Sequence, residues 1–385
     1  AWRFRSYGHE WVHRPGLLGL RLTNVQAHVH ALADCPHLRR IPFLWLGYCE
    51  LSAPDLERLT SSPHLQGVQT LSFKEAEPFS QPLDFLFRAP SLAELRVLSL
   101  PPMSFHSGWQ VPVDCTWQRL RSLDLDSIED PNALLSLASA AAYAKTLRRL
   151  WITGALDSFL EPFTQLPLLR GLRSLALRGT SPSRKLHALL SSPNLASLRH
   201  LEVNTFYPMS TDIGVLLRNP SLRTLRSLTL GGMDRAEDYA AFGEPGILPG
   251  LKSLVLLPGY REGQATPSEI SPGQRALMGG TLVRQLRKLH LGWDRLSSEA
   301  LAALAGPGTL PLLRLEFRVG EGNAAVLSDL VASGRLASLR RLRLTGVFQD
   351  GFGTALAPPG CLPHLRSLCV ESIFNSDAEA LSATI

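Results

Sequence analysis

Leucine alternates with polar residues in short stretches that return throughout the chain. Residues 222–230 read LRTLRSLTL, and close variants occupy 38–46, 65–73, 92–100, 169–177, 195–203 and 336–344. Within this stretch Thr229 separates Leu228 from Leu230, a spacing of two that is typical of a β-strand with one buried face. The pattern predicts a short strand in each unit, with its leucines in a core and residues such as Ser227 and Thr229 pointing outward.

The last apolar residue of each stretch marks a regular period. It falls at Leu22, Leu46, Phe73, Leu100, Leu125, Ile152, Leu177, Val203, Leu230, Leu256, Leu291, Phe317, Leu344 and Val370. The intervals run from 24 to 27 residues, apart from one of 35 between Leu256 and Leu291. Fourteen units at one period predict a solenoid in which equivalent strands stack side by side and in parallel.

The segments that lead from one stretch to the next carry helical spacing. Leu56 with Leu59, Leu301 with Leu304, and the alanine-rich run at 133–147 are examples. Because proline disfavours helix at the residue before it, we expect many of these segments to end just ahead of the next stretch. The prolines concerned are Pro36, Pro63, Pro90, Pro193 and Pro220.

The repeat resembles that of leucine-rich-repeat proteins, whose units of 20–29 residues carry LxxLxL. The resemblance covers nearly the whole chain. It implies an α/β solenoid (a horseshoe) of about 14 repeats, with a parallel concave β-sheet and helical or extended convex segments. The period lies near that of the ribonuclease-inhibitor-like class, and the LRxLxL pattern most resembles bacterial multi-repeat proteins of cytoplasmic type. Mostly apolar residues, such as Val25 and Met103, replace the family's asparagine three positions after the last leucine, so no asparagine ladder is expected.

Parts of the chain depart from the period. Residues 1–16 contain four aromatic side chains and suit an N-terminal cap on a solenoid that spans 17–385. About nine extra residues stand between Leu256 and Leu291, and the Gly-, Pro- and Ser-rich stretch at about 257–281 predicts an exposed insertion loop. The unit between residues 100 and 125 has prolines and no helical period, so we expect an extended return there.

Composition favours a folded chain in a reducing compartment. The 385 residues are 45% hydrophobic and 19% charged, with a net charge of +6. The five cysteines are scattered without a CxxC pair, and no apolar run approaches the roughly 18 residues of a membrane span. The opening residues AWRFRSYGHEW lack the apolar stretch of a signal peptide. Together these features favour a cytoplasmic protein without membrane contact.

The sequence contains no motif for catalysis or cofactor binding. GxxxxGK[ST], GxGxxG, GxSxG and HExxH do not occur. His28 and His30 lie two apart without a cysteine or carboxylate cluster beside them, and Cys361 and Cys369 lie eight apart. Packed or solvated side chains account for both pairs better than a metal or redox site does. The sequence therefore predicts no enzyme, no cofactor and no metal.

The residues between the repeated leucines form the predicted partner surface. Most are small and polar, so the large or charged members are the candidate contacts. They are Phe43, Trp45, Tyr48, Asp124, Arg149, Trp151, His200, Glu202, His290, Trp293, Arg341 and Arg343. Phe43, Trp45 and Tyr48 form an aromatic group that would anchor a partner on the concave face. Alternatively, Trp2 or Trp11 of the cap packs over this group.

A basic residue follows the second leucine of the pattern in ten of the fourteen units. This basic ladder consists of Arg96, Arg121, Arg148, Arg173, Arg199, Arg226, Lys252, Arg287, Arg340 and Arg366. In a structural role, each side chain lies along its neighbour's aliphatic stem and bonds strand-edge carbonyls or a nearby carboxylate. In a functional role, the ladder is a basic rim that attracts an acidic protein or nucleic acid. Aromatic residues that would stack on bases do not interleave with it.

The sequence favours a non-enzymatic scaffold that binds a protein or peptide in its concavity. One alternative is a nucleic-acid-associated protein that uses the basic ladder. Another is a regulatory subunit that docks on an enzyme.

Overall fold

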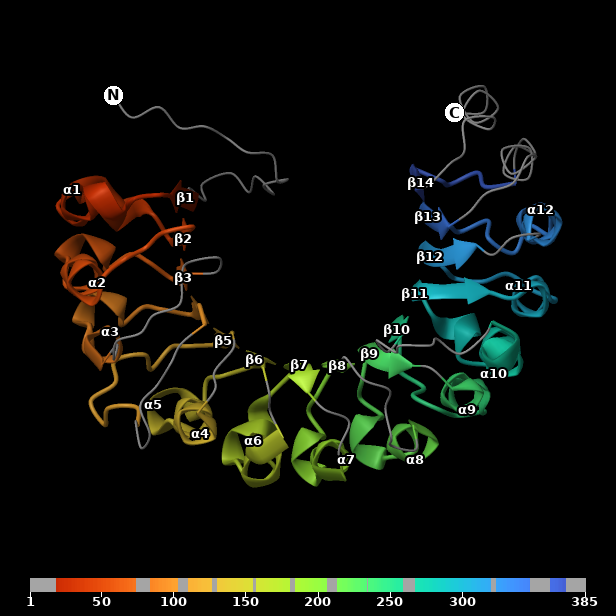
Figure 1. The fold of residues 1–385 in the computed structure, drawn as a ribbon, viewed down its shortest axis with the longest axis horizontal. Helices are drawn as coiled ribbons and strands as arrows, with labels where there is room; N and C mark the ends of the chain where they lie inside the picture. Colours follow the sequence, from red (N-terminus) through yellow and green to blue (C-terminus); the bar gives the residue numbers. More distant parts are fainter. Residues whose placement is uncertain are drawn as a thin grey trace.

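Strands line the inner side of an arc and helices line its outer side (Figure 1). The computed structural model describes residues 19–73, 84–102, 110–126, 130–154, 157–180, 184–205, 213–233, 235–258, 267–319, 323–346 and 361–371. The first and last strands lie at opposite ends of the arc (Figure 1). The concave side is therefore one continuous face of a sheet.

The strands of the described residues form a single 14-stranded parallel sheet in chain order. They are β1 Gly19–Thr23, β2 Phe43–Gly47, β3 Thr70–Ser72, β4 Val97–Leu100, β5 Ser122–Leu125, β6 Arg149–Thr153, β7 Ser174–Thr180, β8 His200–Thr205, β9 Ser227–Met233, β10 Ser253–Pro258, β11 Lys288–Leu296, β12 Arg314–Val319, β13 Arg341–Gly346 and β14 Ser367–Glu371. The register keeps equivalent positions beside each other, so Leu228 pairs with Leu201 on one side and Leu254 on the other. Each sequence repeat therefore supplies one strand.

The alternating leucines of the strands form the core. In β9, Leu228 and Leu230 are fully buried, whereas Ser227 and Thr229 are half-buried on the other face. Burying a leucine side chain contributes roughly 1.5–3 kcal/mol, so each strand is held mainly by its two leucines. The strand register predicted from the sequence is confirmed.

Short helices on the outer side return the chain from one strand to the next. The α-helices are α1 Val29–Ala33, α2 Ala53–Thr60, α3 Asp84–Arg88, α4 Pro131–Ser139, α5 Ala141–Ala144, α6 Asp157–Phe163, α7 Arg184–Leu190, α8 Ile213–Leu217, α9 Ala236–Ala240, α10 Pro267–Gly279, α11 Ser298–Leu304 and α12 Ala324–Ala332. The 3₁₀-helices are η1 Gln26–His28, η2 Pro36–Arg40, η3 Pro63–Leu65, η4 Pro90–Leu92, η5 Pro167–Gly171, η6 Pro193–Leu195, η7 Pro220–Leu222, η8 Ala241–Gly243 and η9 Val283–Gln285. Helices this short are not stable alone and depend on the apolar side that they bury.

Side chains at the first residues set where these helices begin. On α2, the Ser52 hydroxyl accepts from the Asp55 N–H at 3.3 Å, and the Asp55 carboxylate accepts in return from the Ser52 N–H. Pro63 opens η3, where the preceding Ser62 hydroxyl accepts from the His64 N–H at 3.2 Å. The prolines that we expect to stop the helical segments thus also start the turn that leads into the next strand.

Side-chain hydrogen bonds to backbone carbonyls tie each repeat to the one before it. Asn219 Nδ2 donates to Leu190 O at 2.7 Å, and Thr224 Oγ1 donates to Leu198 O at 2.8 Å. Three repeats earlier, Thr146 Oγ1 makes the equivalent bond to Leu120 O at 2.8 Å. The repeats are thus joined by residues such as Asn219 and Thr224. These do not occupy the position, three residues after the last leucine, at which leucine-rich-repeat proteins carry asparagine.

The insertion predicted at about 257–281 is not a loop throughout, because Pro267–Gly279 forms helix α10. This helix lies between α9 and α11 on the outer side (Figure 1). Leu277 is buried, and the backbone at Gly273 approaches so closely that a Cβ there would lie 1.9 Å from Ala236 O. The glycine and proline that indicated a loop instead allow close packing and begin the helix.

Two other departures from the period were expected. Between β4 and β5, the described residues 110–121 contain no helix, in line with the extended return predicted there. The cap predicted at 1–16 lies outside the described residues, as do residues 259–266 of the insertion. The division of the chain into a cap and a solenoid stays a prediction.

The architecture is that of a leucine-rich-repeat solenoid. One parallel sheet runs in chain order, and a helix or turn on its outer side follows nearly every strand. The period of 24–27 residues, with one interval of 35, is the length of one strand and its return. The side chains between the buried leucines therefore face the concave side in every repeat.

Leu228→Ala should lower the free energy of unfolding by roughly 2–5 kcal/mol, because it opens a cavity in a fully buried column. Thr229→Ala, one residue further and on the concave face, is the matched control and should change that energy by about 0.5 kcal/mol or less. Urea unfolding followed by circular dichroism measures both. Equal losses at the two positions would contradict the strand register.

Candidate functional site

The concave face is built from alternate residues of successive strands. The third residues of β5 to β8 are Asp124, Trp151, Ala176 and Glu202, and the register places each beside the next. Adjacent parallel strands lie about 4.8 Å apart, so side chains from neighbouring repeats meet here. Groups of interacting residues on this face therefore form across repeats.

Four residues on β5 to β8 form what we name the central cluster: Asp124, Trp151, Arg178 and Glu202. Arg178 Nε donates to Glu202 Oε1 at 2.7 Å, and Arg178 Cζ lies 5.1 Å from the centre of the Trp151 ring, within cation–π range. The hydrogen bond that Arg178 donates to Glu202 raises the pKa of Arg178 against the effect of partial burial, and the charges of Glu202 and Asp124 raise it further. A carboxylate and a half-buried indole thus hold one arginine on the open face.

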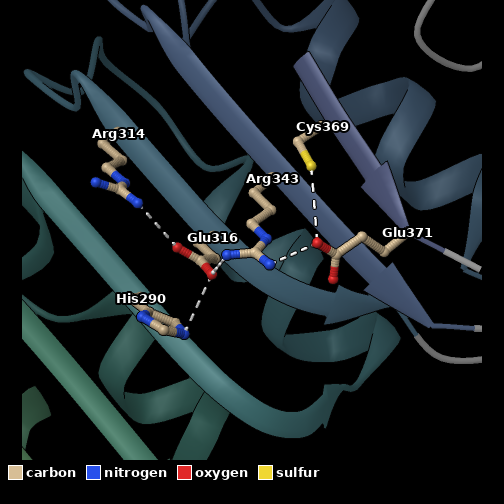
Figure 2. Close-up of polar contacts among 6 residues, drawn as sticks. All are labelled: His290, Arg314, Glu316, Arg343, Cys369 and Glu371. Carbon is tan, nitrogen blue, oxygen red and sulfur yellow. Dashed lines mark hydrogen bonds and ion pairs between the residues drawn. The ribbon is translucent and has the colours of Figure 1, made fainter. Parts of the chain in front are cut away.

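A second group, the C-terminal cluster, consists of His290, Arg314, Glu316, Arg343 and Glu371 (Figure 2). Glu316 is only 7% exposed. Its carboxylate lies 3.2 Å from Arg343 Nη1, 3.5 Å from Arg314 Nη2 and 3.6 Å from His290 Nε2. Arg343 also contacts Glu371 Oε1 through Nη2 at 2.5 Å, so it bridges carboxylates on β12 and β14.

Burial and neighbouring cations decide the charge of this cluster. Burial lowers the pKa of His290; the Glu316 carboxylate opposes this shift, and Lys288, Arg314 and Arg343 reinforce it. Burial and then Arg314 lower the pKa of Lys288 as well, against the attraction of Glu316. His290, with its pKa lowered, is therefore mostly neutral at pH 7. Within the cluster Arg314 and Arg343 then balance Glu316 and Glu371, and Lys288 beside it adds a further positive charge.

The sequence leaves open whether the N-terminal aromatic group is an exposed anchor or is covered, and in the structure Trp45 is buried. Trp45 is 8% exposed, and Arg21 Cζ lies 3.7 Å from the centre of its ring. The ring also covers Gly47, where a Cβ would lie 2.1 Å from Trp45 Cη2, so only glycine leaves room for the flat indole. Phe43 is half-buried, and only Tyr48 is exposed, at 59%. Trp45 thus packs flat against the concave surface of the sheet and is not available as an exposed contact.

The backbone of the basic ladder runs along the amino-terminal ends of the strands. Each N–H donates to the carbonyl one repeat earlier, as from Arg199 to Arg173 at 2.9 Å and from Arg226 to Arg199 at 2.8 Å. Arg148 has the predicted structural role, because its Nη1 donates to Lys145 O and Leu147 O, both at 3.0 Å. Arg96 and Arg148 are half-buried, and the exposed members are Arg121, Arg173, Arg199, Arg226, Lys252, Arg287, Arg340 and Arg366.

Other predicted contacts lie beside the two clusters. Arg149 on β6 and His200 on β8 are exposed, and Arg341 on β13 is exposed next to the C-terminal cluster. Burial lowers the pKa of His200, and nearby arginines, of which Arg149 has the largest effect, lower it further. Trp293 lies on β11, but its side chain is outside the described residues, as are residues 1–16 of the predicted cap. The structure thus groups the charged candidates and separates them from the N-terminal aromatic residues.

Arg178 is the central contact of the central cluster, and Glu316 is that of the C-terminal cluster. Neither residue was among the predicted contacts. Arg178 is the fifth residue of β7, one step beyond the LxL pattern. The alternation continues to that position and would have identified it. The burial of Glu316 depends on His290 and Arg343 from neighbouring repeats, which no local feature of the sequence marks.

The histidine and cysteine pairs singled out in the sequence do not assemble into a site. Within the described part of the chain, no group of three or more His, Cys, Asp or Glu side chains is placed to hold a metal ion. His28 and His30 are exposed, and His30 Nε2 lies 3.9 Å from Asp55 Oδ1. All five cysteines are described, and none forms a disulfide. Across those same residues, no helix has the length and apolar character needed to cross a membrane.

Comparison with known proteins gives similarity to solved structures alone. No protein-family model matches the sequence, and no curated protein matches it. A protein from Bacteroides fragilis is 14% identical with a TM-score of 0.37, over 63% of this chain and 64% of that one, so less than two thirds of its length is matched. A leucine-rich-repeat protein from Leptospira interrogans is 15% identical with a TM-score of 0.30, over 94% of this chain and 92% of that one. The fold assignment rests on the sheet order and the repeat.

Glu316→Gln should lower the free energy of unfolding by roughly 1.5–3 kcal/mol, because it removes a buried charge that accepts hydrogen bonds from two arginines. Glu371→Gln changes an exposed carboxylate that also contacts Arg343, and this control should cost less than about 1 kcal/mol. Denaturant unfolding at pH 7 compares the two variants. A smaller loss for Glu316→Gln than for Glu371→Gln would refute the arrangement of the C-terminal cluster.

Proposed function

We propose that this protein is a recognition scaffold that binds a protein or peptide on the concave face of its sheet. The observation that carries the proposal is the central cluster, in which Arg178 and Trp151 lie together on an open face. Tryptophan and arginine are enriched among the few residues that contribute most to protein–protein affinity. An open sheet that presents both side chains is suited to such a contact.

The charged side chains of this face are positioned before a partner arrives. Glu202 fixes Arg178 from β8, and Glu316 fixes Arg343 from β12. Ordering a long side chain on binding costs roughly 0.5–1.5 kcal/mol. Since both arginines are already held, a partner with complementary carboxylates or carbonyls loses less of its binding energy to this cost.

The size of the face favours a macromolecule over a small ligand. Fourteen strands at a separation of about 4.8 Å form a sheet roughly 60 Å along the arc. The central cluster lies on β5 to β8 and the C-terminal cluster on β11 to β14. A partner that contacts both must be a macromolecule, and a protein domain or an extended peptide is long enough.

The two alternatives differ from this proposal in testable ways. A regulatory subunit would use the same face, and its partner would be an enzyme. A nucleic-acid-associated protein would instead use the basic ladder at the sheet edge, and its affinity would fall steeply as salt rises. Identification of the partner and the salt dependence of its binding therefore separate the three.

Capture of partners from the source organism, followed by titration with the partner identified by mass spectrometry, tests the proposal. Trp151→Ala and Arg178→Ala should each raise the Kd about 30-fold, equivalent to about 2 kcal/mol, since each removes a contact at the centre of the interface. Arg275→Ala, exposed on the outer helix α10, is the control and should bind as the wild type does. Wild-type affinity in both concave-face variants, each shown to be folded by thermal unfolding, would overturn the proposal.

A further inference from the structure

A groove of about 640 Å³ lies on the flank of the solenoid, at the amino ends of β7 to β10. Five cationic side chains line it: Arg173, Arg199, Arg223, Arg226 and Lys252. This surface is separate from the concave face, because its residues precede the strands and do not alternate within them. The proposed function makes no use of it.

Four of the five cations form a row that the backbone spaces evenly. Arg173, Arg199, Arg226 and Lys252 each stand immediately before the first residue of a strand. Their consecutive N–H to carbonyl bonds measure 2.8–2.9 Å, so the row follows the strand separation of about 4.8 Å and is roughly 14 Å long. The sheet therefore sets the spacing of these charges, whatever their side chains do.

These cations differ from several arginines of the outer surface that are paired. Arg58 and Arg218 pair with carboxylates of a neighbouring repeat, at 2.9 Å and 2.5 Å. Among the residues that the structure describes, no carboxylate forms an ion pair with any of the five groove cations. Like charges gathered without a counter-charge create a positive potential that a bound anion relieves. The positive field extends to His200. Burial lowers the pKa of this histidine, and the charges of Arg149, Arg199 and Arg226 lower it further.

We propose that this groove binds an acidic peptide segment, with several Asp or Glu side chains in an extended run. The planar guanidinium group matches a carboxylate through two parallel hydrogen bonds, and four of the five cations are arginines. A row of about 14 Å spans four or five extended residues at roughly 3.3 Å each.

The other lining residues favour a peptide over a single-stranded nucleic acid. They are Ser197, Thr224 and Gly250. None of the described lining residues is aromatic, so the groove offers no ring on which a base could stack, and stacking supplies much of the affinity of such complexes. A carboxylate-bearing chain needs only the cations.

Titration of the full chain with fluorescein-labelled octaglutamate, at low salt and at about 0.15 M salt, tests the proposal by fluorescence anisotropy. The double variant Arg199→Gln/Arg226→Gln should bind about 10-fold more weakly, with a shallower salt dependence, because two charge-assisted contacts are lost. Arg40→Gln/Arg275→Gln removes the same charge from exposed positions outside the groove. At about 0.15 M salt this control should stay within about 2-fold of the wild type, since distant charges are screened.

The ladder hydrogen bonds involve backbone atoms alone, so we expect the groove variants to unfold at the wild-type temperature. Should the double variant fail to fold, Arg223→Gln, which stands outside the ladder, should still weaken octaglutamate binding. Wild-type binding by the folded groove variant, or equal weakening in the control pair, would overturn the proposal. Stronger competition by a thymidine octanucleotide than by unlabelled octaglutamate would also overturn it. Arg178→Ala should leave octaglutamate binding unchanged, so this proposal and the concave-face proposal fail independently.

Discussion

The stacking of each strand on the next, with buried leucines behind it, is the constraint on which the rest of the structure depends. Strands of the described sheet pair with their neighbours in sequence, so each repeat is stabilised by the repeats beside it. Leu201, Leu228 and Leu254 lie side by side in the register and are 0–2% exposed. Because these contacts fix every strand, they also fix the side chains between the leucines.

The same repeat produces two surfaces with different electrostatics. On the concave face, Arg178 and Arg343 are paired with carboxylates of neighbouring strands, Glu202 and Glu316. On the flank, the ladder brings cations together, and in the groove these have no ion pair among the described residues. Paired charges give a rigid, specific face, whereas unpaired charges give a surface that attracts anions. The two surfaces thus suit different features of a partner.

Features that depend on residues of one repeat could be predicted from the sequence, whereas features that depend on contacts between repeats could not. The alternation of Leu228 and Leu230 predicts a strand because both side chains lie in one repeat. The burial of Trp45 depends on Arg21 in the preceding repeat and on the absence of a side chain at Gly47, so the sequence left open whether the indole is exposed or covered. Helix α10 was missed because its glycine and proline, which usually mark loops, permit its close approach to α9.

Recognition on the concave face is the central claim, and covalent labelling of arginine side chains tests it most directly. The chain would be treated with a dicarbonyl reagent alone and in complex with its captured partner, and the labelled positions would be read by mass spectrometry. Arg149 and Arg341 are exposed on the concave strands, and Arg40 and Arg275 are exposed on helices away from them. We expect the partner to slow labelling at Arg149, Arg341 or both, and to leave Arg40 and Arg275 unchanged. Slower labelling at Arg40 or Arg275, with Arg149 and Arg341 reacting as in the free chain, would contradict the account.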